Sequence, residues 1–146
     1  MNDGWKFIKD DGWKNGQGWT QVRLPHTWNV DDVMDDEPGY YRGVGWYKKV
    51  FTVNSDLRDK DVSVYFEGAN QETEVFINGK KAGHHIGGYT AFSIPISNLL
   101  KFGEPNELLL KVDNSYNENI APLTADFTFY GGIYRDVYLT ATNKIH

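Results

Sequence analysis

Residues 73–82, Thr-Glu-Val-Phe-Ile-Asn-Gly-Lys-Lys-Ala, contain the pattern that decides the fold. Every second position, at Thr73, Val75 and Ile77, carries a β-branched side chain, which is typical of a strand with one buried face. Asn78 and Gly79 then interrupt the strand, and both residue types readily adopt the positive φ angles of a two-residue type I′ turn. The stretch therefore predicts a β-hairpin whose second strand begins at Lys80.

The same alternation recurs along the chain. Other strand-like segments are Val62, Val64 and Phe66 on one face, Leu108, Leu110 and Val112 on another, and the runs 46–53 and 133–140. Turn residues separate them, and only residues 97–102 predict a helical turn, capped by Ser97 and stopped by Gly103. Many short strands without crossover helices predict an all-β antiparallel jelly-roll β-sandwich. The Cys–Trp–Cys spacing of antibody-type immunoglobulin domains is absent.

Composition limits the classes of function. The 146 residues suit one domain, 1–146, and the absence of cysteine excludes disulfides and thiolate metal sites. A net charge of −5 argues against a nucleic-acid partner. No apolar run approaches the ~20 residues that cross a bilayer, and the first residues do not resemble a signal peptide. We therefore expect neither a membrane nor a nucleic acid as partner, and the compartment stays unknown.

One stretch points to sugar binding. Residues 126–139, Asp-Phe-Thr-Phe-Tyr-Gly-Gly-Ile-Tyr-Arg-Asp-Val-Tyr-Leu, place an acid among aromatic residues before a β-rich run. Aromatic faces cover the C–H patches of sugars, and carboxylates accept hydrogen bonds from their hydroxyls. No comparable constellation for bond-making chemistry is present, so the pattern favours a binding part of a larger enzyme.

Six motifs in order carry a resemblance to a known family. They are residues 24–29 (Leu-Pro-His-Thr-Trp-Asn), 40–47 (Tyr-Tyr-Arg-Gly-Val-Gly-Trp-Tyr), 66–70 (Phe-Glu-Gly-Ala-Asn), 74–79 (Glu-Val-Phe-Ile-Asn-Gly), 83–92 (Gly-His-His-Ile-Gly-Gly-Tyr-Thr-Ala-Phe) and 126–139. Together they resemble the N-terminal sugar-binding domain of glycoside hydrolase family 2, and β-galactosidase-type members in particular. The resemblance covers the chain from about Trp19 to Leu139.

The resemblance implies a galactose-binding-like jelly roll that is a fragment of a larger glycosidase. In that family an immunoglobulin-like domain and a TIM barrel follow in the same chain. The barrel supplies the two glutamates of the retaining mechanism, which lie about 5–5.5 Å apart. Those glutamates are outside this sequence, so the chain alone is expected to be inactive and to need no cofactor.

The resemblance also implies the site residues. Asp126 matches the acid that binds sugar hydroxyls in β-galactosidase-like members, and Arg42 lies where family members project loop residues toward the same pocket. The implied ligand is a β-galactoside or a related glycoside. Alternatively, Asp126 caps a turn or pairs with Arg135, and Arg42 pairs with the acids from Asp31 to Glu37 in the acidic loop 29–39. Arg135 and Asp136 are not assigned to sugar.

Other chemistry-bearing residues have structural interpretations. Trp28 and Trp46 suit a core better than a sugar platform, and His26 suits a hydrogen-bonded structural role. His84 and His85 point to opposite faces of a strand and are not expected to share a metal ion. The acids of loop 29–39 leave calcium open, although a solvated loop is favoured. Two alternative functions remain, an autonomous carbohydrate-binding module and a purely structural domain.

Overall fold

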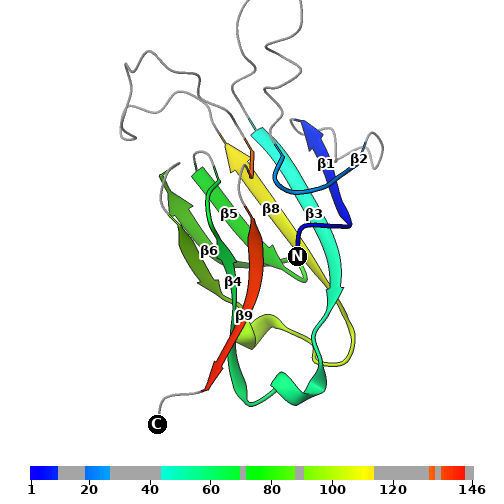
Figure 1. Cartoon of the computed structure of the whole chain (residues 1–146), viewed down its shortest axis with the longest axis vertical. Coiled ribbons are helices and arrows are strands. Elements are labelled where there is room, and N and C mark those ends of the chain that lie inside the picture. The colour runs from blue at the N-terminus through cyan, green and yellow to red at the C-terminus, as the bar shows by residue number, and fades with distance from the viewer. Residues whose placement is uncertain are drawn as a thin grey trace, which may run out of the picture.

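The chain folds as the predicted antiparallel jelly-roll β-sandwich (Figure 1). The computed structural model describes residues 1–9, 19–26, 44–69, 72–87, 91–113, 132–133 and 136–143. A six-stranded sheet has the strand order β2-β1-β3-β8-β5-β6, and a three-stranded sheet has the order β7-β4-β9. All strand pairs that can be followed in these sheets are antiparallel.

The larger sheet contains β1 (Trp5–Lys9), β2 (Thr20–Val22), β3 (Val44–Thr52), β5 (Glu72–Ile77), β6 (Lys80–Ile86) and β8 (Pro105–Asp113). The smaller sheet contains β4 (Lys60–Phe66), β7 (Phe92–Pro95) and β9 (Val137–Asn143). Two short 3-10 helices, η2 (Ser55–Leu57) and η3 (Ser97–Leu99), lie between described strands. No helix in these ranges is both long and apolar enough to span a bilayer.

The core lies between the sheets and follows the alternation of the sequence. The three predicted inward faces are fully buried, and they comprise Val62, Val64 and Phe66 on β4, Thr73, Val75 and Ile77 on β5, and Leu108, Leu110 and Val112 on β8. Burying one such apolar side chain contributes about 1.5–3 kcal/mol relative to leaving it in water. The alternation on these strands therefore explains why the two sheets pack face to face.

The predicted hairpin is confirmed. Asn78 and Gly79 have φ angles of 52° and 83°, and Ile77 pairs with Lys80 across the turn. The backbone N–H of Asn78 donates to the carbonyl of Glu107 at 2.9 Å, and Asn78 Oδ1 accepts from the N–H of Glu107 at 2.9 Å. The turn is thereby fixed to β8 as well as closed within itself.

Asn106 organises the end of the sandwich that carries this turn. Its side chain is 1% exposed, and its Oδ1 accepts hydrogen bonds from Asn78 Nδ2 and Lys101 N at 2.9 and 2.8 Å. Its Nδ2 donates to the carbonyls of Lys101 and Glu104 at 2.9 and 3.0 Å. We call the region formed by the hairpin turn, residues 99–106 and η2 the closed end.

Three local expectations need correction. The helical turn at residues 97–102 is only the 3-10 turn Ser97–Leu99, and Ser97 does not cap it. Ser97 Oγ instead accepts from the N–H of Val62 at 2.6 Å, because β4 runs beside it. The closing strand begins at Val137 and not at Ile133. The opening segment, which has no place among the strands predicted from the sequence, contains the strand β1.

The N-terminus is held by both sheets. Trp5 is fully buried, its ring meets Tyr47 edge-on at 6.4 Å, and its Nε1 donates to the Met1 carbonyl at 2.6 Å. Asn2 Oδ1 accepts from the N–H of Val137 at 3.2 Å, and the Asn2 carbonyl accepts from the N–H of Leu24 at 2.8 Å. The first residues therefore connect β9 of the smaller sheet with the segment that follows β2.

Candidate functional site

The ends of five strands of the larger sheet lie together at the end of the sandwich that is opposite the closed end. We call this second end the rim. Pairing brings Lys9 beside Gly45, Val44 beside Asp113, and Asp113 beside Glu72, which in turn pairs with Ile86. Figure 1 shows these strand ends gathered at the upper end of the sandwich. In jelly rolls, as in other scaffolds, binding residues are carried by the connections that leave such strand ends.

Two long connections are anchored at the same two places on the rim. Residues 27–43 run from His26 to Val44, and residues 114–131 run from Asp113 to Gly132. Val44 pairs with Asp113 between β3 and β8, and the N–H of His26 donates to the carbonyl of Ile133 at 2.8 Å. Each connection therefore starts and ends beside the other. Gly132, which closes the second one, has a φ of 119°, a conformation that a side chain would disfavour.

A buried aromatic cluster supports one of these anchor points. The rings of Phe7 and His26 are 4.7 Å apart, and those of Phe7 and Tyr47 are 4.8 Å apart. The Tyr47 hydroxyl lies 2.7 Å from His26 Nδ1. Burial raises the pKa of Tyr47 far above its ordinary value, and a backbone hydrogen bond with Ile133 opposes the shift only in part.

The hydrogen bond with Tyr47 therefore fixes the orientation of the His26 ring, with Nδ1 toward the phenol. The structural role expected for His26 is confirmed, since its ring, its Nδ1 and its backbone N–H are all engaged. Tyr47 and Ile133 lie within the motifs 40–47 and 126–139, but neither was given a role from the sequence, because their contact depends on two segments far apart in the chain.

The outer face of the larger sheet carries charges next to the rim. Glu72, Glu74, Lys111 and Asp113 line a small depression of about 70 Å³ on β5 and β8. His84 Nε2 lies 3.0 Å from Glu72 Oε1, and Lys111 Nζ lies 5.8 Å from the centre of the Trp46 ring. The acids of this surface have basic side chains between them. The volume of the depression is far below the ~300–1,000 Å³ of a small-molecule pocket.

The structure separates the two adjacent histidines, as predicted. His85 stacks on Phe92, with ring centres 4.0 Å apart and planes inclined by 10°, whereas His84 pairs with Glu72 on the other face. Burial lowers the pKa of His85, and the neighbouring His84 lowers it further. Within the described ranges, no three or more His, Asp or Glu side chains are grouped so as to hold a metal ion.

The residues predicted to form the site lie outside the part of the chain that the structure describes. Asp126, Arg42, Arg135, Trp28 and the acidic loop 29–39 lie outside the described residues. Their anchor points are described, and Arg42 precedes Val44 by two positions. Trp46 is 8% exposed and therefore buried, but it lies outside the main core cluster, with Lys111 near its ring, so its predicted place in the sandwich core is only partly confirmed. The structure therefore shows where the segments of Asp126 and Arg42 attach, and the contacts of these two side chains remain predictions.

Comparison with known proteins yields one family. Residues 9–143 match the profile of the sugar binding domain of glycosyl hydrolases family 2. The chain is 41% identical over 145 residues to a β-glucuronidase of Bacteroides fragilis, which covers 99% of the chain and 20% of that protein. It is 34% identical over 149 residues to a β-galactosidase of Thermoanaerobacter pseudethanolicus, covering 100% and 19%.

A solved structure of a related protein is similar over nearly the whole chain. A β-glucuronidase from Bacteroides uniformis superposes with a TM-score of 0.87 at 43% identity, over 98% of this chain and 17% of that one. The chain thus spans about a fifth of the length of the proteins it matches, which are named both β-glucuronidase and β-galactosidase. The galactosidase type expected from the sequence is therefore not singled out.

Proposed function

Because the chain belongs to the sugar binding domain of glycosyl hydrolases family 2, we propose that it completes the substrate site of a retaining β-glycosidase. In this proposal residues 1–146 form one domain of a longer chain, in which an immunoglobulin-like domain and a TIM barrel follow. The barrel holds the catalytic pair of carboxylates, and this domain contributes side chains to the sugar subsite without making or breaking bonds.

The common anchoring of the two long connections carries the proposal. The segment with Asp126 and the segment with Arg42 share both anchor points on the rim, Val44 with Asp113 and His26 with Ile133. A rigid β-scaffold that fixes both attachment points lowers the entropic cost of presenting two side chains in one binding geometry. In this proposal Asp126 accepts hydrogen bonds from sugar hydroxyls, and Arg42 contributes to the same subsite.

Asp126 is the residue whose removal tests the proposal. A hydrogen bond to a charged group contributes about 1.5–3 kcal/mol, so Asp126→Ala in the full-length enzyme should lower kcat/KM by roughly tenfold to a hundredfold. Asp56→Ala is the matched control, because Asp56 is an exposed acid on η2 at the closed end. An unchanged kcat/KM in a folded Asp126→Ala enzyme would leave the domain a purely structural role.

The substrate has two candidates. The match of Asp126 to β-galactosidase-like members favours a β-galactoside, whereas the names of the B. fragilis and B. uniformis relatives favour a β-glucuronide. Hydrolysis of nitrophenyl β-galactoside and nitrophenyl β-glucuronide by the full-length enzyme separates them. An autonomous module would bind lactose or a glucuronide at the rim as an isolated chain, whereas an accessory domain without its barrel should show almost no binding there.

A further inference from the structure

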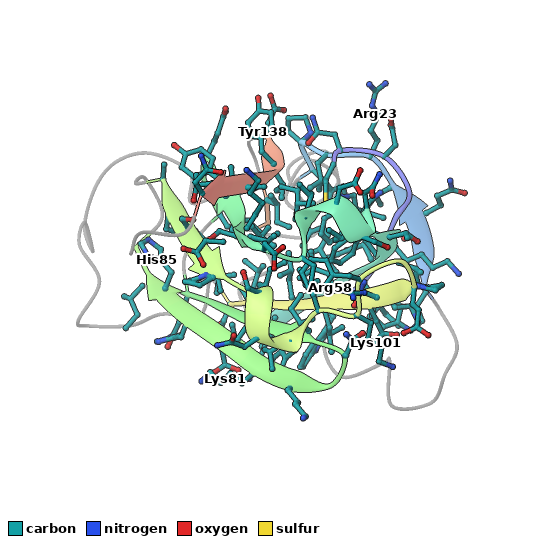
Figure 2. The ribbon with its side chains drawn as sticks, turned by 90° about the horizontal axis from the view of Figure 1, so that it is seen from below. Arg23, Arg58, Lys81, His85, Lys101 and Tyr138 are labelled. Carbon is teal, nitrogen blue, oxygen red and sulfur yellow. The ribbon has the colours of Figure 1, made fainter. Side chains whose placement is uncertain are left out.

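The outer face of the smaller sheet carries a pair of tyrosines on neighbouring strands. Tyr65 on β4 and Tyr138 on β9 are direct partners in the strand register, and their ring centres lie 6.4 Å apart with planes inclined by 31°. Tyr138 is 42% exposed, and Figure 2 shows it projecting from β9 away from the sandwich. Ser93 of β7 pairs with Tyr65 on the other side, so one row of side chains crosses all three strands.

A carboxylate next to these rings is held in place. Asp136 Oδ2 accepts from the Tyr138 hydroxyl at 3.2 Å, and Asp136 Oδ1 accepts from Asn2 Nδ2 at 3.1 Å. The backbone carbonyl of Asp136 also accepts from the N–H of Glu67 at 3.1 Å. A carboxylate has about four lone-pair sites, so Asp136 keeps acceptor capacity toward solvent after these bonds. Its position needs little further ordering when a ligand arrives.

A second carboxylate lies close to the same hydroxyl. The hydrogen bond to Asp136 raises the pKa of Tyr138, and the charge of Glu67 raises it further. The two acids thus flank a phenol that stays protonated and keeps donating. We call the surface formed by Tyr65, Glu67, Asp136 and Tyr138 the tyrosine–acid face.

We propose that the tyrosine–acid face binds a neutral oligosaccharide chain, at a site separate from the rim connections. The ring faces cover C–H patches of the sugar rings, while Asp136 and Glu67 accept hydrogen bonds from the hydroxyls at their margin. The two negative charges repel uronates and phosphates, so the ligand is uncharged. The core of a protein–protein interface is depleted of charged residues, so two acids beside one exposed and one half-buried ring favour a polyhydroxylated ligand over a protein.

All four residues of the tyrosine–acid face belong to this chain, so the folded chain of 146 residues is the test sample. We expect titration with cellohexaose, a neutral β-linked probe, to shift the backbone NMR signals of residues 63–67 and 136–140 with a dissociation constant on the order of 1 mM. Hexagalacturonate, a chain of similar length that carries one charge per sugar, should shift them far less. Equal binding of the two probes, or shifts centred on another part of the chain, would overturn the proposal.

Three variants locate the contact. Tyr138→Ala should weaken cellohexaose binding at least tenfold, whereas Tyr138→Phe keeps the ring, loses the hydrogen bond to Asp136 and should weaken it less. Thr142→Ala is the matched control, because Thr142 is exposed on the same face of β9. Binding that survives in a folded Tyr138→Ala chain refutes the site. Asp126→Ala should leave this binding unchanged, so its outcome is independent of the proposed function of the rim.

Discussion

The closed end and the rim of the sandwich are held together by different means. At the closed end, the side chains of Asn78 and Asn106 bind the backbone of residues close in sequence and of one neighbouring strand. At the rim, contacts join residues far apart in the chain, such as His26 with Ile133 and Val44 with Asp113. Amide networks specify one tight conformation, whereas anchored strand ends specify only where a connection begins and ends.

Removing the side-chain amide of Asn106, at the centre of the closed end, should lower the free energy of unfolding more than any other change proposed below. Asn106→Ala leaves the N–H of Lys101, Asn78 Nδ2 and two carbonyls without the partner they have now. Since one unsatisfied buried polar group costs about 1–3 kcal/mol, we expect the free energy of unfolding to fall by about 3 kcal/mol. Urea denaturation of Asn106→Ala measures it, with Glu107→Ala as control because Glu107 is exposed and joins the network through its backbone. A loss below about 1 kcal/mol would contradict the role of this network.

The corresponding change near the rim is Tyr47→Phe. The variant keeps the ring against Phe7 and Trp5 and loses the hydroxyl at His26 Nδ1. We expect a loss of about 1–2 kcal/mol, because the hydrogen bonds of the buried hydroxyl with His26 and with the backbone of Ile133 are both removed. Amide hydrogen exchange should accelerate at His26 and Ile133 and stay unchanged at Asn78. Equal acceleration at both ends would mean that the two regions do not open separately.

A substitution in the hairpin turn tests whether the conformation of the turn depends on its own two residues. A Cβ at Gly79 would meet no heavy atom within 4 Å, so the positive φ of 83° is the only obstacle to a side chain. Gly79→Ala should therefore cost about 1 kcal/mol, the strain of a left-handed residue. Thermal unfolding gives the value, and Gly79→Asn, which tolerates positive φ, should recover most of it. A neutral Gly79→Ala variant would show that the turn adapts to another type.

The smallest expected effect is a pH dependence beside the rim. Since burial lowers the pKa of His85 in the folded state, the unfolded chain binds more protons near the ordinary histidine pKa of about 6.5. Stability should therefore fall as the pH drops through that value, by less than about 1 kcal/mol at this partly exposed site. His85→Gln should flatten the dependence of the urea midpoint between pH 7.5 and pH 5.5. His84→Gln should retain most of it, because burial is the larger cause.

Local pattern predicted the parts of the fold that depend on local chemistry. The alternation at Val62, Val64 and Phe66 and the turn at Asn78-Gly79 required only period two and positive φ. The strand β1 was missed because its five residues include two lysines and it is stabilised by pairing with β3, which lies some forty positions away. Ser97 was misassigned as a cap because its true partner, Val62, is distant in sequence.

The candidate site shows the same division. The structural role of His26 and the separation of His84 from His85 follow from residue type and strand geometry. The shared anchoring of residues 27–43 and 114–131 could not be predicted, because it depends on which strands become neighbours in the larger sheet. Asp126 and Arg42 were identified by family resemblance, and their roles remain predictions for the full-length enzyme.

The shared anchors have a consequence for how such a domain diversifies. Because residues 27–43 and 114–131 depart from and return to the same two points, either can be lengthened, shortened or exchanged for a homologue's version without altering the register of β3 against β8. Closing a longer loop between fixed ends adds only about 0.6 kcal/mol for each doubling of its length. Under the proposed function, transplanting both segments together as one cassette should alter which glycoside the full-length protein accepts.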